Sequence, residues 1–419
     1  MMNRRQFVKG IFAASAGCAG FISGGIHGPL FRYAHAETRK TLVVIFQRGG
    51  CDGLNTCIPY RETRYYELRP TVAVPPPKAS DATSALDLDG FFGFHPGLAS
   101  LQPIFNAGNL AVLPAVHYPE SSRSHFDSQY FIESAANRRR LDGWLNRHLN
   151  SLPNTPQLRS VAFAEIMPQS LRGKAPVSLF KELREFKFNI DRKIETKMIE
   201  NLQAFNLPTP GETRPYRTWL HQTGRALLND MELVYSLSEQ KYKPSKTAAY
   251  PDTLYGRQLQ QTAQLIKANV GLEVVTLDIN GWDTHAGQGN GEATSRHYLK
   301  LKEFADGIAA LYTDLGEKMN DVVIMSYTEF GRTAKENASH GTDHGNACTW
   351  FLAGKSVNGG IHGEWPGLEN DQLFRGRYLD FTIDYRDIMG DILTHHLGNE
   401  QLDYLLPKHN YSPLGLFNG

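Results

Sequence analysis

Four short apolar runs, each followed by a polar or glycine-rich cluster, constrain the fold of this chain more than any other feature. The runs are rich in β-branched residues and are continuously apolar, which is typical of strands buried on both faces of a parallel sheet. They are Thr41–Phe46, Leu110–Val116, Leu272–Leu277 and Asp321–Met325. Helical spacing separates the later runs, at 255–269 and 294–315. We therefore expect an α/β fold with a central, largely parallel mixed sheet flanked by helices.

The rest of the chain fits the same plan. Trp350–Ala353 is a further candidate strand, and Asp384–Leu397 is a candidate final helix that Asp384 caps and Gly398 stops. Residues from about 140 to 270 are rich in proline, charge and helical patterns, so we expect a mainly helical insertion or cap there. Residues 37–419 then form a single domain.

The first 36 residues have the pattern of an export signal. Asn3–Lys9 resembles the twin-arginine signal through Arg4 and Arg5, a mildly apolar run follows, and Ala34–Ala36 offers a small-residue cleavage site. The run is too short and too rich in glycine for a good membrane span. We expect recognition by the twin-arginine translocation machinery, a periplasmic or secreted location and no transmembrane span in the mature protein.

Charge and cysteine content exclude two classes of protein. Removing the signal takes away four basic residues and no acidic one, and the remaining chain has no basic stripe, so we expect no nucleic-acid partner. Three cysteines remain, Cys51, Cys57 and Cys348, which allows one disulfide at most and excludes a disulfide scaffold. Cys51 and Cys348 are neighbours if their loops line one site, and both pairing and simple burial stay open.

Polar residues at the ends of the runs are the candidate functional groups. Asp52 follows two glycines after the first run, where it is either a metal ligand or the cap of a helix. Asp283 and His285 follow a later run, and carboxylate and imidazole together are metal ligands. Since the carboxyl ends of parallel strands share one edge of a sheet, these side chains are expected to converge.

A second kind of cluster follows the second run. Ser124 lies where a helix begins, so it is either a helix cap or a nucleophile at a helix N-terminus. His125 and Arg123 flank it directly and are its candidate catalytic partners. Glu329, at the end of the last run, is open as a ligand, a general base or a partner for Arg332.

The chain resembles the domain-of-unknown-function 1501 family, whose members are bacterial and commonly carry twin-arginine signals. The similarity extends from about Thr41 to Gly398. Its signature stretches are Val43–Thr56, Ser122–Phe126, Asp142–Leu145, Gly281–His285, Thr328–Arg332 and Gly341–Gly345. That family is grouped with the alkaline phosphatase and sulfatase superfamily. The resemblance implies an alkaline-phosphatase-like sheet and a metal-assisted site for phosphate or sulfate esters.

The resemblance also implies a set of metal ligands. Asp52 matches the ligating aspartate after the first strand. Asp283 and His285 resemble an aspartate and a histidine after a later strand, although their spacing is closer, and His344 resembles the late metal-binding histidine. With Asp343 beside it, these residues are the implied ligands of a divalent ion, which would be Zn, Ca or Mg.

Catalytic roles follow in the same way. Ser124 lies where the superfamily's nucleophile opens a helix, with Ser122 as the alternative, and Arg123 or Arg48 would hold the oxyanion. The sequence departs from the pattern at 328–331, where Glu329 can replace a carboxylate but the phenylalanine after it cannot replace a histidine. One metal is then an alternative to two.

Two functions remain in view. The first is an exported metal-dependent hydrolase of phosphate or sulfate esters, which takes a small anionic ester as its substrate. The alternative is a non-catalytic envelope protein that uses the same pocket to bind an anionic ligand or a metal.

Overall fold

The structure is a computed structural model that describes residues 40–119, 121–136, 140–152, 158–183, 192–205, 211, 214–238 and 240–418. Every structural statement below concerns those residues. The candidate export signal lies outside them, and so does its cleavage site.

A nine-stranded sheet forms the centre of the described chain, in the order β11-β5-β10-β9-β1-β8-β6-β7, with β12 also pairing with β5. The strands are β1 (Thr41–Arg48), β5 (Leu110–His117), β6 (Ser160–Phe163), β7 (Ser178–Phe180), β8 (Val274–Asn280), β9 (Val322–Tyr327), β10 (Cys348–Ala353), β11 (Gly360–Ile361) and β12 (Ile383–Asp384). Strand β10 runs antiparallel to β5 and β9, and the other described pairs of this sheet are parallel. The expected mixed, largely parallel sheet is confirmed.

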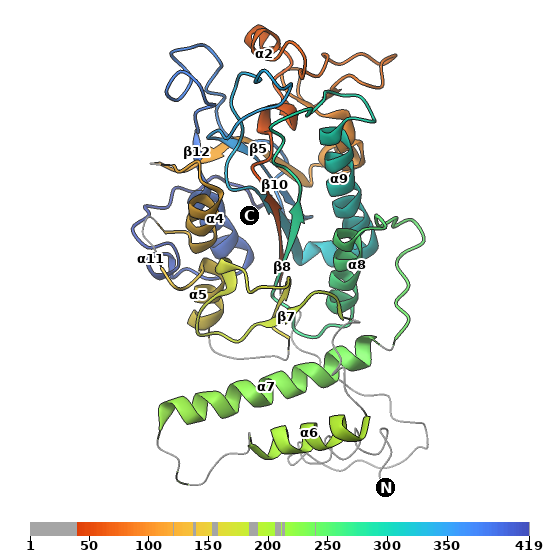
Figure 1. Ribbon diagram of the computed structural model, residues 1–419, viewed down its shortest axis with the longest axis vertical. Helices are drawn as coiled ribbons and strands as arrows, with labels where there is room; N and C mark the ends of the chain where they lie inside the picture. The colour runs from red at the N-terminus through yellow and green to blue at the C-terminus, as the bar shows by residue number, and fades with distance from the viewer. Residues whose placement is uncertain are drawn as a thin grey trace. The chain divides into compact units, whose positions relative to one another are not determined.

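Helices cover both faces of this sheet, which explains why the strand runs are continuously apolar. One face carries α3 (Gln102–Asn106), α8 (Leu254–Lys267) and α9 (Arg296–Leu315); the other carries α4 (His125–Ser134), α5 (Trp144–Ser151), α10 (Tyr385–Asp391) and α11 (Leu402–Leu405). In Figure 1, α8 and α9 lie on one side of β8 and β10, with α4, α5 and α11 on the other. Alternate residues of β1 serve the two layers, Val43 on the first face and Val44 on the second.

The region from about 140 to 270 contains the helices α6 (Arg192–Phe205), α7 (Pro215–Ser238) and α8. It also supplies β6 and β7, which extend the parallel part of the sheet beyond β8. The region is therefore part insertion and part sheet edge.

A short three-stranded sheet lies apart from the main one, in the order β2 (Cys57–Ile58), β4 (Gly93–Phe94), β3 (Leu86–Asp87). It follows the first strand-end loop and is joined to α2 (Thr63–Leu68).

The predicted start and end of the helix at 384–397 are confirmed. The Asp384 side chain accepts a hydrogen bond from the Arg386 N–H at the start of α10, so it caps that helix as expected. The helix continues as a π-helical turn over Ile392–His396 and ends before Gly398, whose φ is +65°.

None of the described helices is both long and apolar enough to span a membrane.

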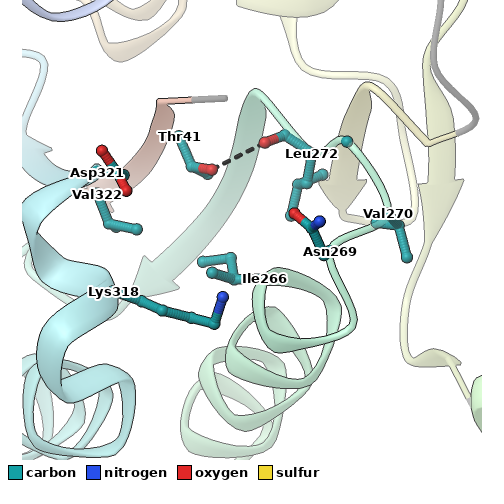
Figure 2. Close-up of a pocket in the computed structure, with 9 residues that line it drawn as sticks. Thr41, Ile266, Asn269, Val270, Leu272, Lys318, Asp321 and Val322 are labelled. Carbon is teal, nitrogen blue, oxygen red and sulfur yellow. Dashed lines mark hydrogen bonds between the residues drawn. The ribbon is translucent and has the colours of Figure 1, made fainter. Parts of the chain in front are cut away.

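A small pocket lies at the amino end of β1, where the Thr41 hydroxyl donates to the Leu272 carbonyl at 2.8 Å and Lys318 reaches in from the far side (Figure 2). This pocket is at the edge of the sheet opposite to the polar loops, so it is not the site that the sequence predicts.

Candidate metal centre

The carboxyl ends of β1, β5, β8 and β9 point to one edge of the sheet, because β5 and β9 both run antiparallel to β10 and the others are parallel. The loops that follow these strands carry the candidate residues. The topology therefore brings together segments that are more than two hundred residues apart in sequence, such as His125 and His344.

Three side chains from three of these loops form a group that fits a metal ion. One ligating atom each from His125, Asp283 and His344 lies within 4.8 Å of the other two. The Nε2 atoms of His125 and His344 are 3.0 Å apart, and Asp283 Oδ1 lies 3.4 Å from His344 Nε2. Neighbouring ligand atoms around a tetrahedral zinc ion lie about 3.4 Å apart, given zinc–nitrogen distances near 2 Å.

His285 joins the edge of this group. Its Nε2 lies 3.0 Å from His344 Nε2 and 3.0 Å from Asp283 Oδ1. The structure thus brings together Asp283, His285 and His344, which the sequence singled out as ligands. It adds His125, which the sequence placed among the catalytic residues.

The second ring nitrogen of each histidine is held by an oxygen atom. Nδ1 of His125 lies 2.7 Å from Glu329 Oε1, Nδ1 of His285 lies 3.1 Å from Asp343 Oδ1, and Nδ1 of His344 lies 2.9 Å from the Arg123 carbonyl. A carbonyl or an ionised carboxylate accepts only, so each Nδ1 donates. This is the arrangement by which proteins orient metal-binding histidines.

The tautomers that follow leave three lone pairs facing one another. A neutral imidazole that is protonated at Nδ1 carries a lone pair at Nε2. Burial lowers the pKa of His344, and nearby His125 lowers it further, which favours the neutral ring. Lone pairs 3.0 Å apart repel unless a positive charge lies between them. A single proton removes the repulsion in one such contact, whereas a divalent ion removes it in all of them and also binds Asp283.

Glu329 lies behind His125 and is outside the group of candidate ligands. It is fully buried, and besides the His125 contact it accepts hydrogen bonds from Gly49 N–H at 2.9 Å, Gln129 Nε2 at 2.9 Å and Thr328 Oγ1 at 3.0 Å. Burial raises the pKa of Glu329, but the hydrogen bonds from His125 and Gln129 outweigh it and hold the pKa below its usual value.

Glycine is required where β1 meets this carboxylate. Gly49 has φ +123°, and a Cβ there would lie 2.8 Å from the Asp283 backbone nitrogen. Gly49 therefore lets the first loop come close to the loop after β8 while its N–H points at Glu329.

Asp283 is held by Arg332 from the protein side. Arg332 Nη2 donates to Asp283 Oδ1 at 2.7 Å, and the rest of that buried guanidinium bonds the carbonyls of Gly50, Thr342 and Trp282. Burial raises the pKa of Asp283, but Arg332 outweighs it and holds the pKa below its usual value. Glu329 thus contacts His125, and Arg332 contacts Asp283.

Phe330 forms the floor of the group. Its ring centroid lies 4.8 Å from that of His125 and 4.9 Å from that of His344, and the side chain is fully buried. A hydrocarbon ring thus closes the buried side of the group. The other side of the group is open, since about half of the Asp283 side chain is exposed.

Asp52 is not in this group. It is fully buried and forms a two-pronged ion pair with Arg69, at 2.7 and 3.0 Å, and it also accepts from Gln288 Nε2 at 2.5 Å. Its charge is compensated without a metal. Gln288 in turn accepts from Thr284 and Thr342, so Asp52 is linked through Gln288 to the two loops that carry the candidate ligands.

Ser124 is the N-cap of α4 by position, but its side chain makes no capping hydrogen bond. Its N–H instead bonds Ser122 Oγ at 3.1 Å. The two candidate oxyanion arginines are placed differently. Arg48 is held by Asp278 at 2.6 Å and Gln129 at 3.0 Å, while the Arg123 guanidinium lies over the Tyr378 ring at 5.1 Å.

The cysteines do not pair. Cys51, Cys57 and Cys348 are each free and buried. Burial raises the pKa of Cys51 to about 12, so this thiol is not a nucleophile at neutral pH. Simple burial, one of the two readings left open by the sequence, is the one found.

The residues that support the site were not predicted from the sequence. Arg69 and Gln129 are ordinary polar residues in their local stretches, and only the folded chain places them against Asp52 and Glu329. The one available signal was the number of acidic residues at the ends of buried strands, because a buried carboxylate needs a compensating partner.

The donor set favours one kind of ion. Three imidazoles and one carboxylate suit zinc or another borderline transition metal, whereas calcium and magnesium prefer oxygen ligands. The fold and this group define an α/β protein with a candidate imidazole-rich metal centre at the carboxyl edge of its sheet.

A family profile described as "Protein of unknown function (DUF1501)" matches residues 111–401, and the chain belongs to that family. No curated protein matches the sequence.

Solved structures with a similar fold include several enzymes, all at low identity. The lipoteichoic acid synthase LtaP from Listeria monocytogenes is 10% identical, with 86% of this chain and 72% of that chain covered and a TM-score of 0.37. The PsFucS1 sulfatase from Pseudoalteromonas sp. is 10% identical, with 91% and 74% covered and a TM-score of 0.36. The phosphonate monoester hydrolase of Agrobacterium radiobacter is 12% identical, with 90% and 79% covered and a TM-score of 0.30. At these values the likeness says nothing about the reaction.

Proposed function

We propose that this protein is an exported, metal-dependent hydrolase of phosphate or sulfate esters. The observation that carries the proposal is the convergence of three Nε2 atoms, with the Nδ1 atom of each ring already committed to an oxygen. His125, His344 and Asp283 would hold the ion, and His285 would complete the set. A bound divalent ion would polarise the ester and lower the pKa of a nucleophile beside it.

The charges around the group favour an anionic substrate. Asp283 is paired with Arg332 and Asp343 with Arg377, while Glu329 accepts hydrogen bonds from His125 and Gln129. A divalent ion would add two positive charges at the exposed side of Asp283. The open side of the site therefore suits a dianion such as a phosphate monoester, or a monoanion such as a sulfate ester.

Helix α4 supports the same substrate class. It begins at His125, so the positive end of its dipole lies next to the candidate metal ligands. Ser124 would supply the attacking oxygen. A new bond forms from Ser124 Oγ to phosphorus or sulfur, and the bond to the alcohol oxygen breaks. The hydroxyl proton of Ser124 passes to solvent. The alcohol leaves with a proton from water, and a second water hydrolyses the serine ester.

The test is hydrolysis of p-nitrophenyl phosphate and p-nitrophenyl sulfate by protein loaded with zinc, with Ser124→Ala compared against Ser122→Ala. We expect Ser124→Ala to lose activity by about 100-fold or more while it keeps its metal. Equal losses in the two variants would contradict the assignment of the nucleophile.

One observation favours the alternative, a non-catalytic binding protein. Asp52, which the resemblance implies as a metal ligand, is instead paired with Arg69. Protein that binds one zinc per chain but hydrolyses neither ester would support that alternative.

A further inference from the structure

Two arginines from distant segments flank one tyrosine beside the metal centre. The guanidinium carbon of Arg123 lies 5.1 Å from the ring centroid of Tyr378, and that of Arg377 lies 5.6 Å from it. Tyr378 is largely buried, whereas Arg377 is more than half exposed. The Tyr378 ring thus contacts two guanidinium groups next to the exposed side of the metal centre.

Three short segments set the distance of this trio from the metal ligands. Arg332 forms an isolated bridge with His344, and Thr333 forms the next bridge with Tyr378, so 343–344, 332–333 and 378 lie side by side. Adjacent strands are about 4.8 Å apart, which puts Tyr378 on the order of 10 Å from His344. Arg123 connects the two places, because its carbonyl accepts from His344 Nδ1 while its guanidinium lies over Tyr378.

The trio lacks an acceptor that its chemistry calls for. Nη1 of Arg123 is shielded from solvent and has no hydrogen-bond partner in the part of the chain that the structure describes. An unsatisfied N–H on a charged, buried group is unfavourable, and the face of Tyr378 offsets that cost only in part. Besides the Tyr378 ring, the Arg377 guanidinium has one carboxylate partner among the described residues, Asp343 Oδ2 at 3.4 Å, and both side chains are substantially exposed.

We propose that Arg123, Tyr378 and Arg377 form a second anion-binding subsite, which takes a phosphate or sulfate group other than the one at the metal. Guanidinium groups bind such oxoanions through paired N–H donors. Taken with the proposed function, on which this step rests, the subsite defines the substrate class. The substrate carries two anionic groups on the order of 10 Å apart, as in a multiply phosphorylated or sulfated molecule, and is not a simple monoester.

The first experiment tests the subsite without metal and without turnover. Binding of inorganic sulfate to chelator-treated, full-length mature protein is measured by equilibrium dialysis at low salt. We expect Arg377→Ala and Arg123→Ala each to weaken sulfate binding by about 10-fold. Arg375→Ala is the matched control, since it removes the same charge two residues away, where the side chain is exposed over Phe374. An equal loss in Arg375→Ala, or no loss in the other two, overturns the subsite.

The second experiment asks whether the subsite and the metal centre bind one molecule. The zinc-loaded protein is titrated with hexane-1,6-bisphosphonate and with hexylphosphonate, neither of which is hydrolysed. We expect the bisphosphonate to bind at least 10-fold more tightly, and Arg377→Ala but not Arg375→Ala to remove that preference. Equal affinities in the wild type overturn the inference about the substrate. Failure of the proposed hydrolysis alone does not affect either binding result, so the two failures are distinguishable.

Discussion

Nε2 of His125 lies 3.0 Å from Nε2 of His344, while Nδ1 of the first ring faces Glu329 and Nδ1 of the second faces a backbone carbonyl. Two acceptors at this distance need a cation between them. Because the Nδ1 partners come from the loop after β9 and from the loop before α4, the fold orients both rings. The candidate metal centre is in this sense preorganised, and we expect an ion to bind there without refolding.

The first prediction concerns metal content. Protein purified without chelators should contain about one zinc-like ion per chain, and His344→Ala should weaken metal binding by about 100-fold or more, because His344 contacts every other member of the group. His340→Ala is the control: it lies on the same loop but is exposed and pairs with Thr71. Metal analysis by mass spectrometry, with circular dichroism for the fold, decides. Full metal in His344→Ala would rule out the centre.

The second prediction concerns Asp52. Replacing it with asparagine leaves the Arg69 guanidinium buried and unpaired, so we expect a loss of about 3–5 kcal/mol in the free energy of unfolding. Metal content should be unchanged, because Asp52 is not in the ligand group. Denaturant unfolding and metal analysis on the same sample measure both. An Asp52→Asn variant that keeps its stability and loses its metal would restore the role that the sequence suggested.

Export is the third prediction. The Arg4–Arg5 pair and the Ala34–Ala36 site predict a twin-arginine substrate. Replacing both arginines with lysine should leave uncleaved precursor in the cytoplasm, as judged by cell fractionation and mass of the mature N-terminus. Arg32→Lys, which lies outside the motif, is the control. Normal periplasmic arrival of the double variant would show that another route carries the protein.

The sequence predicted β1, β5, β8, β9 and β10 because each is a continuous apolar run, whereas the short strands β6, β7, β11 and β12 carry too few residues to give such a signal. Edge convergence of Asp283, His285 and His344 also followed from parallel pairing alone. The role of His125 did not, because a histidine at a helix start looks the same whether it acts as a base or as a ligand. Its role depends on which oxygen faces Nδ1, and that oxygen belongs to Glu329, 204 residues away.

Asp52 shows what a local sequence pattern cannot distinguish. Its local pattern, glycines and an acid after a buried strand, is the same for a metal ligand and for a buried ion-pair member. The difference lies in Arg69, seventeen residues on, whose side chain turns back into the core. Local patterns locate the carboxylates, but the partner that compensates each charge is a long-range property.

The fourth prediction is a pH dependence of stability. His117 is fully buried at the end of β5, neither ring nitrogen has a hydrogen-bond partner among the described residues, and burial lowers its pKa to about 3. The unfolded chain binds a proton near pH 6.5 and the folded protein does not, so stability falls as pH drops from about 6.5 towards 3. His117→Phe should reduce that fall by about 1.4 kcal/mol per pH unit, measured by denaturant unfolding between pH 6 and 4. His340→Phe, at an exposed position, should leave the slope unchanged, and identical slopes for His117→Phe and wild type would contradict the argument.

The last prediction isolates the positioning role of Glu329. In Glu329→Gln a neutral amide oxygen replaces the carboxylate oxygen that accepts from Nδ1–H of His125, so that hydrogen bond becomes weaker. We expect His125 to populate its other tautomer more often and metal affinity to fall by about 10–100-fold, while the other ligands stay in place. Chelator competition measures the affinity, and nitrogen-15 NMR of the histidine rings reports the tautomer. Glu336→Gln is the matched control, because that carboxylate accepts from Thr71 and Val72 without touching a histidine. If Glu329→Gln binds metal as tightly as the wild type, the carboxylate does not orient His125, and the tautomer argument for the whole centre fails.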